Sequence, residues 1–121
     1  TPALRAAMTR YLERVAAECG DIDVLIYNAR GGYAMQEPLE VRFDELEEIF
    51  RLEVMGAFAA AKAVMPAMIA RGRGSVIYSS ATAAFRGSAT NPVFAIGKFG
   101  LRALAQSLAK AYARRGVHVA H

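Results

Sequence analysis

Short apolar runs alternate with longer helical segments along this chain, and this alternation constrains its fold more than any other feature. Residues 22–27 form an almost continuous apolar run, typical of a buried strand covered on both faces, and residues 75–80 and 117–119 are two further strand candidates. Apolar residues recur at helical spacing in the segments before and between these strands, over residues 1–20, 43–70 and 92–115. Strands that alternate with helices predict βαβ units. We therefore expect a doubly wound, three-layer α/β/α fold with a parallel sheet.

The whole chain, residues 1–121, is expected to form part of a single domain. Its hydrophobic content of 55% is enough for one core, and no linker or repeat divides it. The chain starts directly in a helix without a methionine, and it stops at His121 where a strand is forming. These ends predict the central part of a longer domain, with further strands before and after it.

Charge and cysteine content narrow the class of protein. Fifteen basic and eleven acidic residues give a net charge of +4, and the arginines are scattered, so no nucleic-acid or membrane surface is expected. Cys19 is the one cysteine, which excludes an intrachain disulfide. No signal peptide is recognisable, and no uninterrupted apolar stretch reaches the roughly 20 residues of a membrane span. These features predict a soluble, cytoplasmic protein.

Five short motifs occur in one order along the chain, in residues 23–29, 54–58, 65–68, 74–80 and 94–98. In order and spacing they resemble the short-chain dehydrogenase/reductase family. Asn28 and Ala29 match its Asn-Asn-Ala-Gly turn, in which Tyr27 and Arg30 replace the first Asn and the Gly. The resemblance implies a Rossmann-like fold and hydride transfer between NAD or NADP and a small alcohol or carbonyl substrate.

The fifth motif resembles the family's Tyr-x-x-x-Lys, with Phe94 in the tyrosine position and Lys98 in place. In the family the lysine lowers the pKa of the phenol and binds the nicotinamide ribose, while the tyrosine exchanges a proton with the substrate. Phe94 has no such proton, and loss of a general acid removes about 10²–10⁴-fold in rate. Ser80 is the candidate for the serine that holds the substrate carbonyl. Because its spacing to Phe94 is about one residue too long, Thr82 is the alternative.

Glu53 is the second departure from the family pattern, because it stands where the family often has an Asn that supports a proton relay to the lysine. It also falls on the apolar stripe of the helix predicted over residues 43–70, where an unpaired carboxylate is unexpected. One hypothesis is that Glu53 supplies the missing proton, directly or through water. The alternative is a glutamate on the helix surface that pairs with a nearby arginine.

The resemblance also implies cofactor and partner sites. Asn28, Ala29 and Lys98 are the expected cofactor-binding residues, and no metal site is expected. The glycine-rich turn that holds the pyrophosphate in the family is absent from these residues, so it is expected before Thr1, and the isolated chain is expected to be inactive. Members of the family pair through the helices that correspond to residues 43–70 and 92–115. A homo-oligomer is therefore expected, and a non-catalytic homologue that serves binding or assembly is the alternative function.

Overall fold

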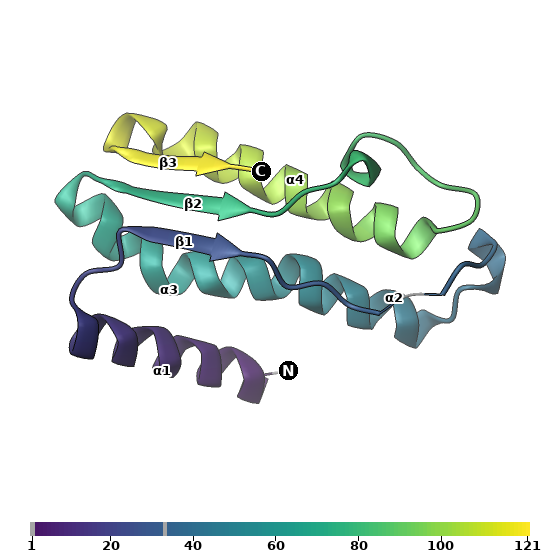
Figure 1. Cartoon of the computed structure of the whole chain (residues 1–121), viewed down its shortest axis with the longest axis horizontal. Coiled ribbons are helices and arrows are strands. Elements are labelled where there is room, and N and C mark those ends of the chain that lie inside the picture. Colours follow the sequence, from purple (N-terminus) through teal and green to yellow (C-terminus); the bar gives the residue numbers. More distant parts are fainter. Residues whose placement is uncertain (1, 33) are drawn as a thin grey trace.

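Three parallel strands form the sheet of this protein, and they follow one another across it in sequence order (Figure 1). The computed structural model describes residues 2–32 and 34–121. In this part of the chain, Tyr27 pairs with Tyr78, and Val76 pairs with Val119. The strands are β1 (Val24–Tyr27), β2 (Gly74–Tyr78) and β3 (Val117–Ala120). The predicted parallel α/β sheet is confirmed.

Helices precede and connect the strands, close to the predicted ranges. The α-helices are α1 (Pro2–Cys19), α2 (Phe43–Phe50), α3 (Gly56–Arg71) and α4 (Pro92–Tyr112). Short 3₁₀ turns are η1 (Pro38–Glu40), η3 (Thr82–Ala84) and η4 (Ala113–Arg115). The single helix predicted over residues 43–70 is interrupted by a π-helical turn, η2 (Arg51–Met55), between α2 and α3. The stretch Phe43–Arg71 is long and apolar enough to cross a membrane by length and composition, but its buried face packs in the core beside the sheet.

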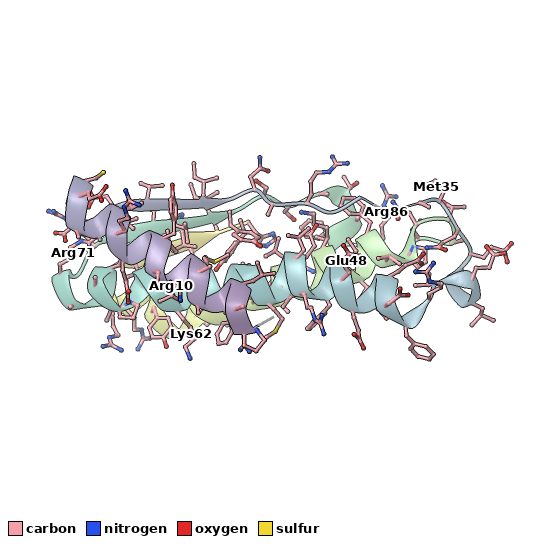
Figure 2. All side chains as sticks on the ribbon, turned by 90° about the horizontal axis from the view of Figure 1, so that it is seen from below. Arg10, Met35, Glu48, Lys62, Arg71 and Arg86 are labelled. Atoms are coloured by element: carbon pink, nitrogen blue, oxygen red, sulfur yellow. The ribbon has the colours of Figure 1, made fainter. Side chains whose placement is uncertain are left out.

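Among the described residues, helices α3 and α4 cover one face of the sheet, so the strand expected at 22–27 has a covered face and an open face in this part of the chain. Tyr27 is buried toward the helices, whereas Val24 and Ile26 are exposed. Figure 2 shows α3, drawn in teal, on one side of the strands. The physical reason is the strand order: two successive right-handed crossovers that move in the same direction place both connecting helices on the same face. A reversal of strand order would be needed to reach the other face.

The core lies between the sheet and the helices. Tyr78 is one of its largest buried side chains, and its hydroxyl donates a hydrogen bond of 3.1 Å to the carbonyl oxygen of Ala57. Its ring packs edge-on against Tyr27 with the ring centroids 6.1 Å apart. Two strands are thereby tied to α3 through one phenol.

Because Tyr78 is buried, we expect the free energy of unfolding to decrease at alkaline pH. Burial, with a smaller contribution from Tyr27, raises the pKa of Tyr78 from its ordinary 10.0 to about 12. As the pH rises, Tyr78 therefore loses its proton in the unfolded chain before it does so in the folded chain. Its contribution to the free energy of unfolding is complete below pH 10 and is lost as the pH rises through the folded pKa of about 12. Denaturant unfolding at pH 9 and pH 11 should show this decline in the parent chain and a smaller one in Tyr78→Phe. Tyr11→Phe, which removes an exposed phenol, should behave like the parent; equal declines in all three chains would contradict this account.

Candidate functional site

Residues from distant parts of the chain meet at the carboxyl ends of β1 and β2. Asn28 and Ala29 follow β1, Ser79 and Ser80 follow β2, and the first turns of α4 lie beside them (Figure 1). In open parallel sheets this edge is where ligands bind. The structure therefore gathers at one edge of the sheet the residues that the sequence singles out.

Lys98 is the centre of this site. Its side chain is buried, with 5% of the residue exposed, although it lies on α4 among residues that reach the surface. The Nζ ammonium donates a hydrogen bond of 2.9 Å to the carbonyl oxygen of Ser79. It also lies 3.1 Å from Oε2 of Glu53 and 5.7 Å from the centre of the Phe94 ring. Burial, a backbone acceptor and a counter-ion all fix this ammonium.

Glu53 lies inside the protein with 1% of the residue exposed, so its predicted inward position is confirmed. The alternative of a surface glutamate paired with an arginine is wrong, because its ion-pair partner is the buried Lys98. Neither carboxylate oxygen has a hydrogen bond from another described residue in good geometry. The ion pair with Lys98 is therefore what offsets the cost of burying this carboxylate.

The π-helical turn η2 holds Glu53 in place through two close contacts with neighbouring elements. The Tyr27 hydroxyl donates a hydrogen bond of 2.5 Å to the carbonyl oxygen of Leu52, the residue before Glu53. On the opposite side, Gly97 lets α4 approach closely, since a Cβ on Gly97 would lie 3.0 Å from Cγ of Glu53. Both contacts place the Glu53 carboxylate next to Lys98, the residue that follows Gly97.

Tyr27 is the member of this site whose role the sequence alone does not predict. It occupies the place of the first Asn of the family's turn, and the structure buries its ring at the end of β1. Burial, and to a smaller extent the negative charge of Glu53, raises the pKa of Tyr27. In the sequence, its role is indicated only by the replacement of an Asn of the family pattern. The structure adds that its hydroxyl binds the carbonyl of Leu52 in η2.

The other predicted site residues lie at the same edge but are more accessible. Asn28 is exposed, and Ala29 and Ser80 are half-buried. Thr82, the alternative to Ser80, is exposed at the start of η3. Lys98 is bound through the backbone of Ser79 rather than through either hydroxyl. Ser80 and Thr82 thus both follow β2 at this edge of the sheet.

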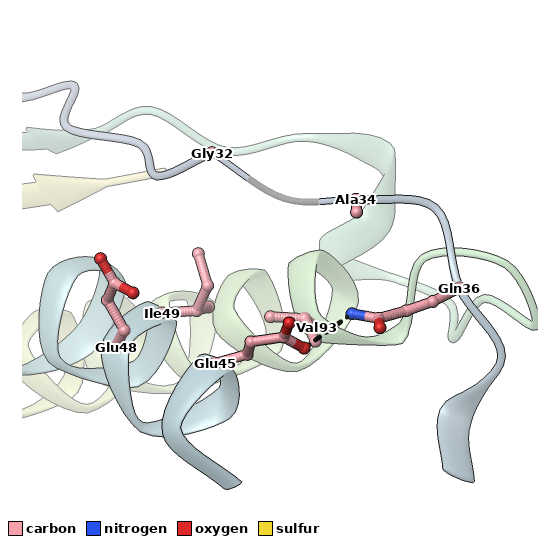
Figure 3. Close-up of a pocket in the computed structure, with 7 residues that line it drawn as sticks. All are labelled: Gly32, Ala34, Gln36, Glu45, Glu48, Ile49 and Val93. Carbon is pink, nitrogen blue, oxygen red and sulfur yellow. Dashed lines mark hydrogen bonds between the residues drawn. The ribbon is translucent and has the colours of Figure 1, made fainter. Parts of the chain in front are cut away.

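A small cavity of about 90 Å³ lies beside this site, between the segment that follows β1, helix α2 and the start of α4 (Figure 3). Val93, the neighbour of Phe94, forms part of its wall. The backbone N–H of Gln36 donates to the carbonyl of Thr90 at 2.9 Å, which joins two walls of the cavity. The remaining lining residues are Gly32, Ala34, Gln36, Glu45, Glu48 and Ile49.

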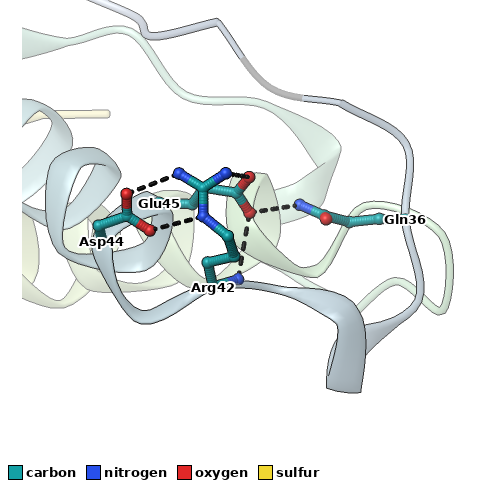
Figure 4. Close-up of polar contacts among 4 residues, drawn as sticks. All are labelled: Gln36, Arg42, Asp44 and Glu45. Atoms are coloured by element: carbon teal, nitrogen blue, oxygen red, sulfur yellow. Dashed lines mark hydrogen bonds and ion pairs between the residues drawn. The ribbon is translucent and has the colours of Figure 1, made fainter.

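A polar network fixes one wall of the cavity (Figure 4). The Gln36 side chain donates a hydrogen bond of 3.0 Å to Glu45, which also accepts one of 3.2 Å from the backbone N–H of Arg42. The Arg42 guanidinium pairs with Asp44 at 2.6 Å, and this hydrogen bond lowers the pKa of Asp44. Most of these charges are solvated, so their interaction shapes the entry to α2 more than it stabilises the fold.

Known proteins share both the sequence pattern and this arrangement. The family model of the short chain dehydrogenases matches residues 3–121. A 3-oxoacyl-[acyl-carrier-protein] reductase from Salmonella typhimurium is 32% identical over 115 residues, which cover 94% of this chain and 46% of the reductase. The chain thus spans about half the length of this curated relative.

Solved structures agree with this relationship. A short-chain dehydrogenase from Streptomyces avermitilis has a TM-score of 0.89 and 30% identity over 95% of this chain and 42% of its own. An NAD⁺-bound xylitol dehydrogenase has a TM-score of 0.90 and 25% identity, over 96% of this chain and 45% of its own. The Rossmann-like fold expected from the sequence is therefore confirmed, and the chain belongs to the short chain dehydrogenase family, with Phe94 where the family pattern has its tyrosine.

Proposed function

We propose that the protein containing this chain is an NAD(P)-dependent oxidoreductase that transfers hydride between the nicotinamide and a small alcohol or carbonyl substrate. The observation that carries this proposal is the buried Lys98 ammonium, held at the carboxyl ends of the strands within a chain that matches the family over residues 3–121. A lysine buried at this cost, with a dedicated counter-ion, is expected at a functional site more often than in a structural core.

The residues at this edge fit one half of a nicotinamide dinucleotide. Lys98 has donors for ribose hydroxyls, and exposed Asn28 and half-buried Ala29 flank the place where the sheet ends. When bound, the cofactor would supply or accept the hydride. A gluconate 5-dehydrogenase from Burkholderia cenocepacia, 27% identical over 95% of this chain, was solved with NADP and tartrate, and the xylitol dehydrogenase carries NAD⁺. Both cofactor forms are therefore represented among the relatives.

The proposed roles of the remaining residues follow from their side chains. Ser80 would bind the substrate oxygen, with Thr82 as the alternative. Phe94 would line the cleft as an apolar wall, because its ring carries no transferable proton. Glu53 is ion-paired with the Lys98 ammonium at 3.1 Å, so we propose that it acts through Lys98 rather than as the proton donor. Turnover should then be slower than in relatives that have the tyrosine, by about 10²–10⁴-fold.

Activity assays on the protein that contains this chain, called the longer protein below, test this proposal. Oxidation of NADH and NADPH should be followed with a panel of small ketones and aldehydes, and reduction of NAD⁺ and NADP⁺ with a panel of small alcohols and hydroxy acids. We expect slow, saturable turnover that Lys98→Met removes, whereas Lys110→Met, which alters an exposed lysine at the end of the same helix, should retain it. Turnover that survives Lys98→Met would contradict the assignment of the site.

A second proposed function is assembly into a homo-oligomer through the helical segments of residues 43–70 and 92–115, in a cytoplasmic protein with no nucleic-acid or membrane partner. A groove of about 280 Å³ lies between α3 and α4, and its mainly apolar wall includes exposed Phe58 and Pro66 and half-buried Tyr112. An exposed apolar groove of this kind favours a contact with another protein surface. Sedimentation of the longer protein and of Phe58→Glu should show a dimer or larger assembly that the substitution dissociates.

A further inference from the structure

The positive charge of Lys98 is neutralised by an ion pair with Glu53. Members of the family use this charge to lower the pKa of their tyrosine, whose position is taken here by Phe94. The Lys98 ammonium lies 3.1 Å from a carboxylate that is itself almost completely buried. We propose that Glu53 is the positioning residue of this site: it anchors Lys98 and neutralises it, so that a neutral ion pair, rather than a free cation, faces position 94. This inference deepens the proposed function and rests on it for the role of Lys98, but its test needs neither cofactor nor turnover.

The contacts of Glu53 support a positioning role. Its carboxylate oxygens accept no hydrogen bond in good geometry from another described residue, so Lys98 is the partner on which its burial depends. The ammonium in turn has one backbone acceptor, the carbonyl of Ser79. Each charge therefore holds the other against α4 and η2, and neither group is free to turn toward a different partner without leaving a buried charge unpaired.

The elements around the pair are shaped to keep it in this position. Tyr27 binds the carbonyl of Leu52 in η2, and Gly97 leaves room for the Glu53 side chain against α4. From β1, Tyr27 is a titratable group close enough to Glu53 for the negative charge of Glu53 to raise its pKa, after the larger effect of burial. Because its pKa is raised, its phenol stays uncharged at neutral pH. The ion pair of Glu53 and Lys98 therefore carries no net charge where it faces position 94.

Because Glu53 neutralises Lys98, the two departures from the family pattern, Phe94 and Glu53, depend on each other. A free ammonium near a phenol lowers the pKa of the phenol because it favours the phenolate, by 1–3 units for an opposite charge at about 4–6 Å. A carboxylate in contact with that ammonium opposes the effect at similar distance. Restoring the tyrosine by Phe94→Tyr alone should therefore not restore an acidic phenol. Removing the Glu53 charge as well should do so.

Nuclear magnetic resonance of the 121-residue chain with ¹³Cζ-labelled tyrosine tests this inference. Phe94→Tyr adds one resonance, whose titration reports the pKa of the introduced phenol. We expect this phenol to titrate no lower than exposed Tyr11 in the single variant, and at least about one unit lower in Phe94→Tyr/Glu53→Gln. Phe94→Tyr/Glu47→Gln, which removes an exposed carboxylate paired with Arg51, should titrate like the single variant.

Two outcomes would overturn the inference: a low phenol pKa in the single variant, or no decrease when Glu53 is neutralised. Glu53→Asn provides a second neutral variant if Glu53→Gln does not fold, as judged by circular dichroism and by the dispersion of amide resonances. The isolated chain without cofactor gives this readout. A decrease on neutralising Glu53, together with no binding of NADH or NADPH by the longer protein, would retain the inference about Glu53 and reject the proposed function.

Discussion

Replacing Lys98 with methionine should lower the free energy of unfolding by about 3–5 kcal/mol, because it leaves the Glu53 carboxylate buried without a counter-ion. Methionine fills much of the same space, so the loss should come mainly from the charge rather than from a cavity. Denaturant unfolding of the 121-residue chain, followed by circular dichroism, measures this difference.

The double variant Lys98→Met/Glu53→Gln separates charge from packing. Removing both charges should recover most of the loss, since an uncharged pair avoids the unpaired carboxylate. Lys110→Met, on the exposed end of α4, should stay within about 0.5 kcal/mol of the parent. A double variant no more stable than Lys98→Met would show that the ion pair does not determine the stability of this site.

Gly56→Ala should lower the free energy of unfolding by about 1–3 kcal/mol through overpacking. A Cβ at this position would lie 2.2 Å from the hydroxyl oxygen of Tyr27, and that hydroxyl is fixed by its hydrogen bond to Leu52. The alanine must therefore displace either the phenol or the π-helical turn. Thermal or denaturant unfolding of the purified chain gives the measurement.

Tyr27→Phe offers a direct rescue of this overpacking. Without the hydroxyl, the nearest ring atom would lie 3.3 Å from the new Cβ, which a small adjustment accommodates. Gly56→Ala should therefore be less destabilising in the Tyr27→Phe background than in the parent. Gly87→Ala is the control, because no atom lies within 4 Å of a Cβ there. Equal costs of Gly56→Ala in the two backgrounds would contradict the contact.

The sequence predicts much of the fold because its local patterns are strong. The apolar runs at 22–27 and 75–80 become β1 and β2, and the helical spacing over 92–115 becomes α4 and η4. It does not predict η2, and it does not predict that the Leu52 carbonyl in η2 accepts a hydrogen bond from Tyr27 in another element. That α3 and α4 lie on the same face of the sheet follows from the strand order, which local patterns do not contain.

The candidate site, like the fold, is predicted in part from local sequence patterns and in part depends on tertiary packing. The burial of Glu53 follows from its helical spacing with Ile49 and Ala57, and the structure confirms it. Its partner does not follow from spacing, because Lys98 lies on a different helix and only close approach at Gly97 brings the two charges together. The motifs therefore locate the site, whereas the packing of η2 against α4 determines that Glu53 pairs with Lys98.

Titration of NADH and NADPH into the protein that contains this chain, followed by nicotinamide fluorescence, shows whether the chain keeps the cofactor-binding part of a short-chain dehydrogenase site although Phe94 replaces its tyrosine. We predict saturable binding of one of the two cofactors, weakened in Lys98→Met and unchanged in Lys110→Met. Absence of binding by either cofactor, or equal binding by the parent and Lys98→Met, would contradict this prediction.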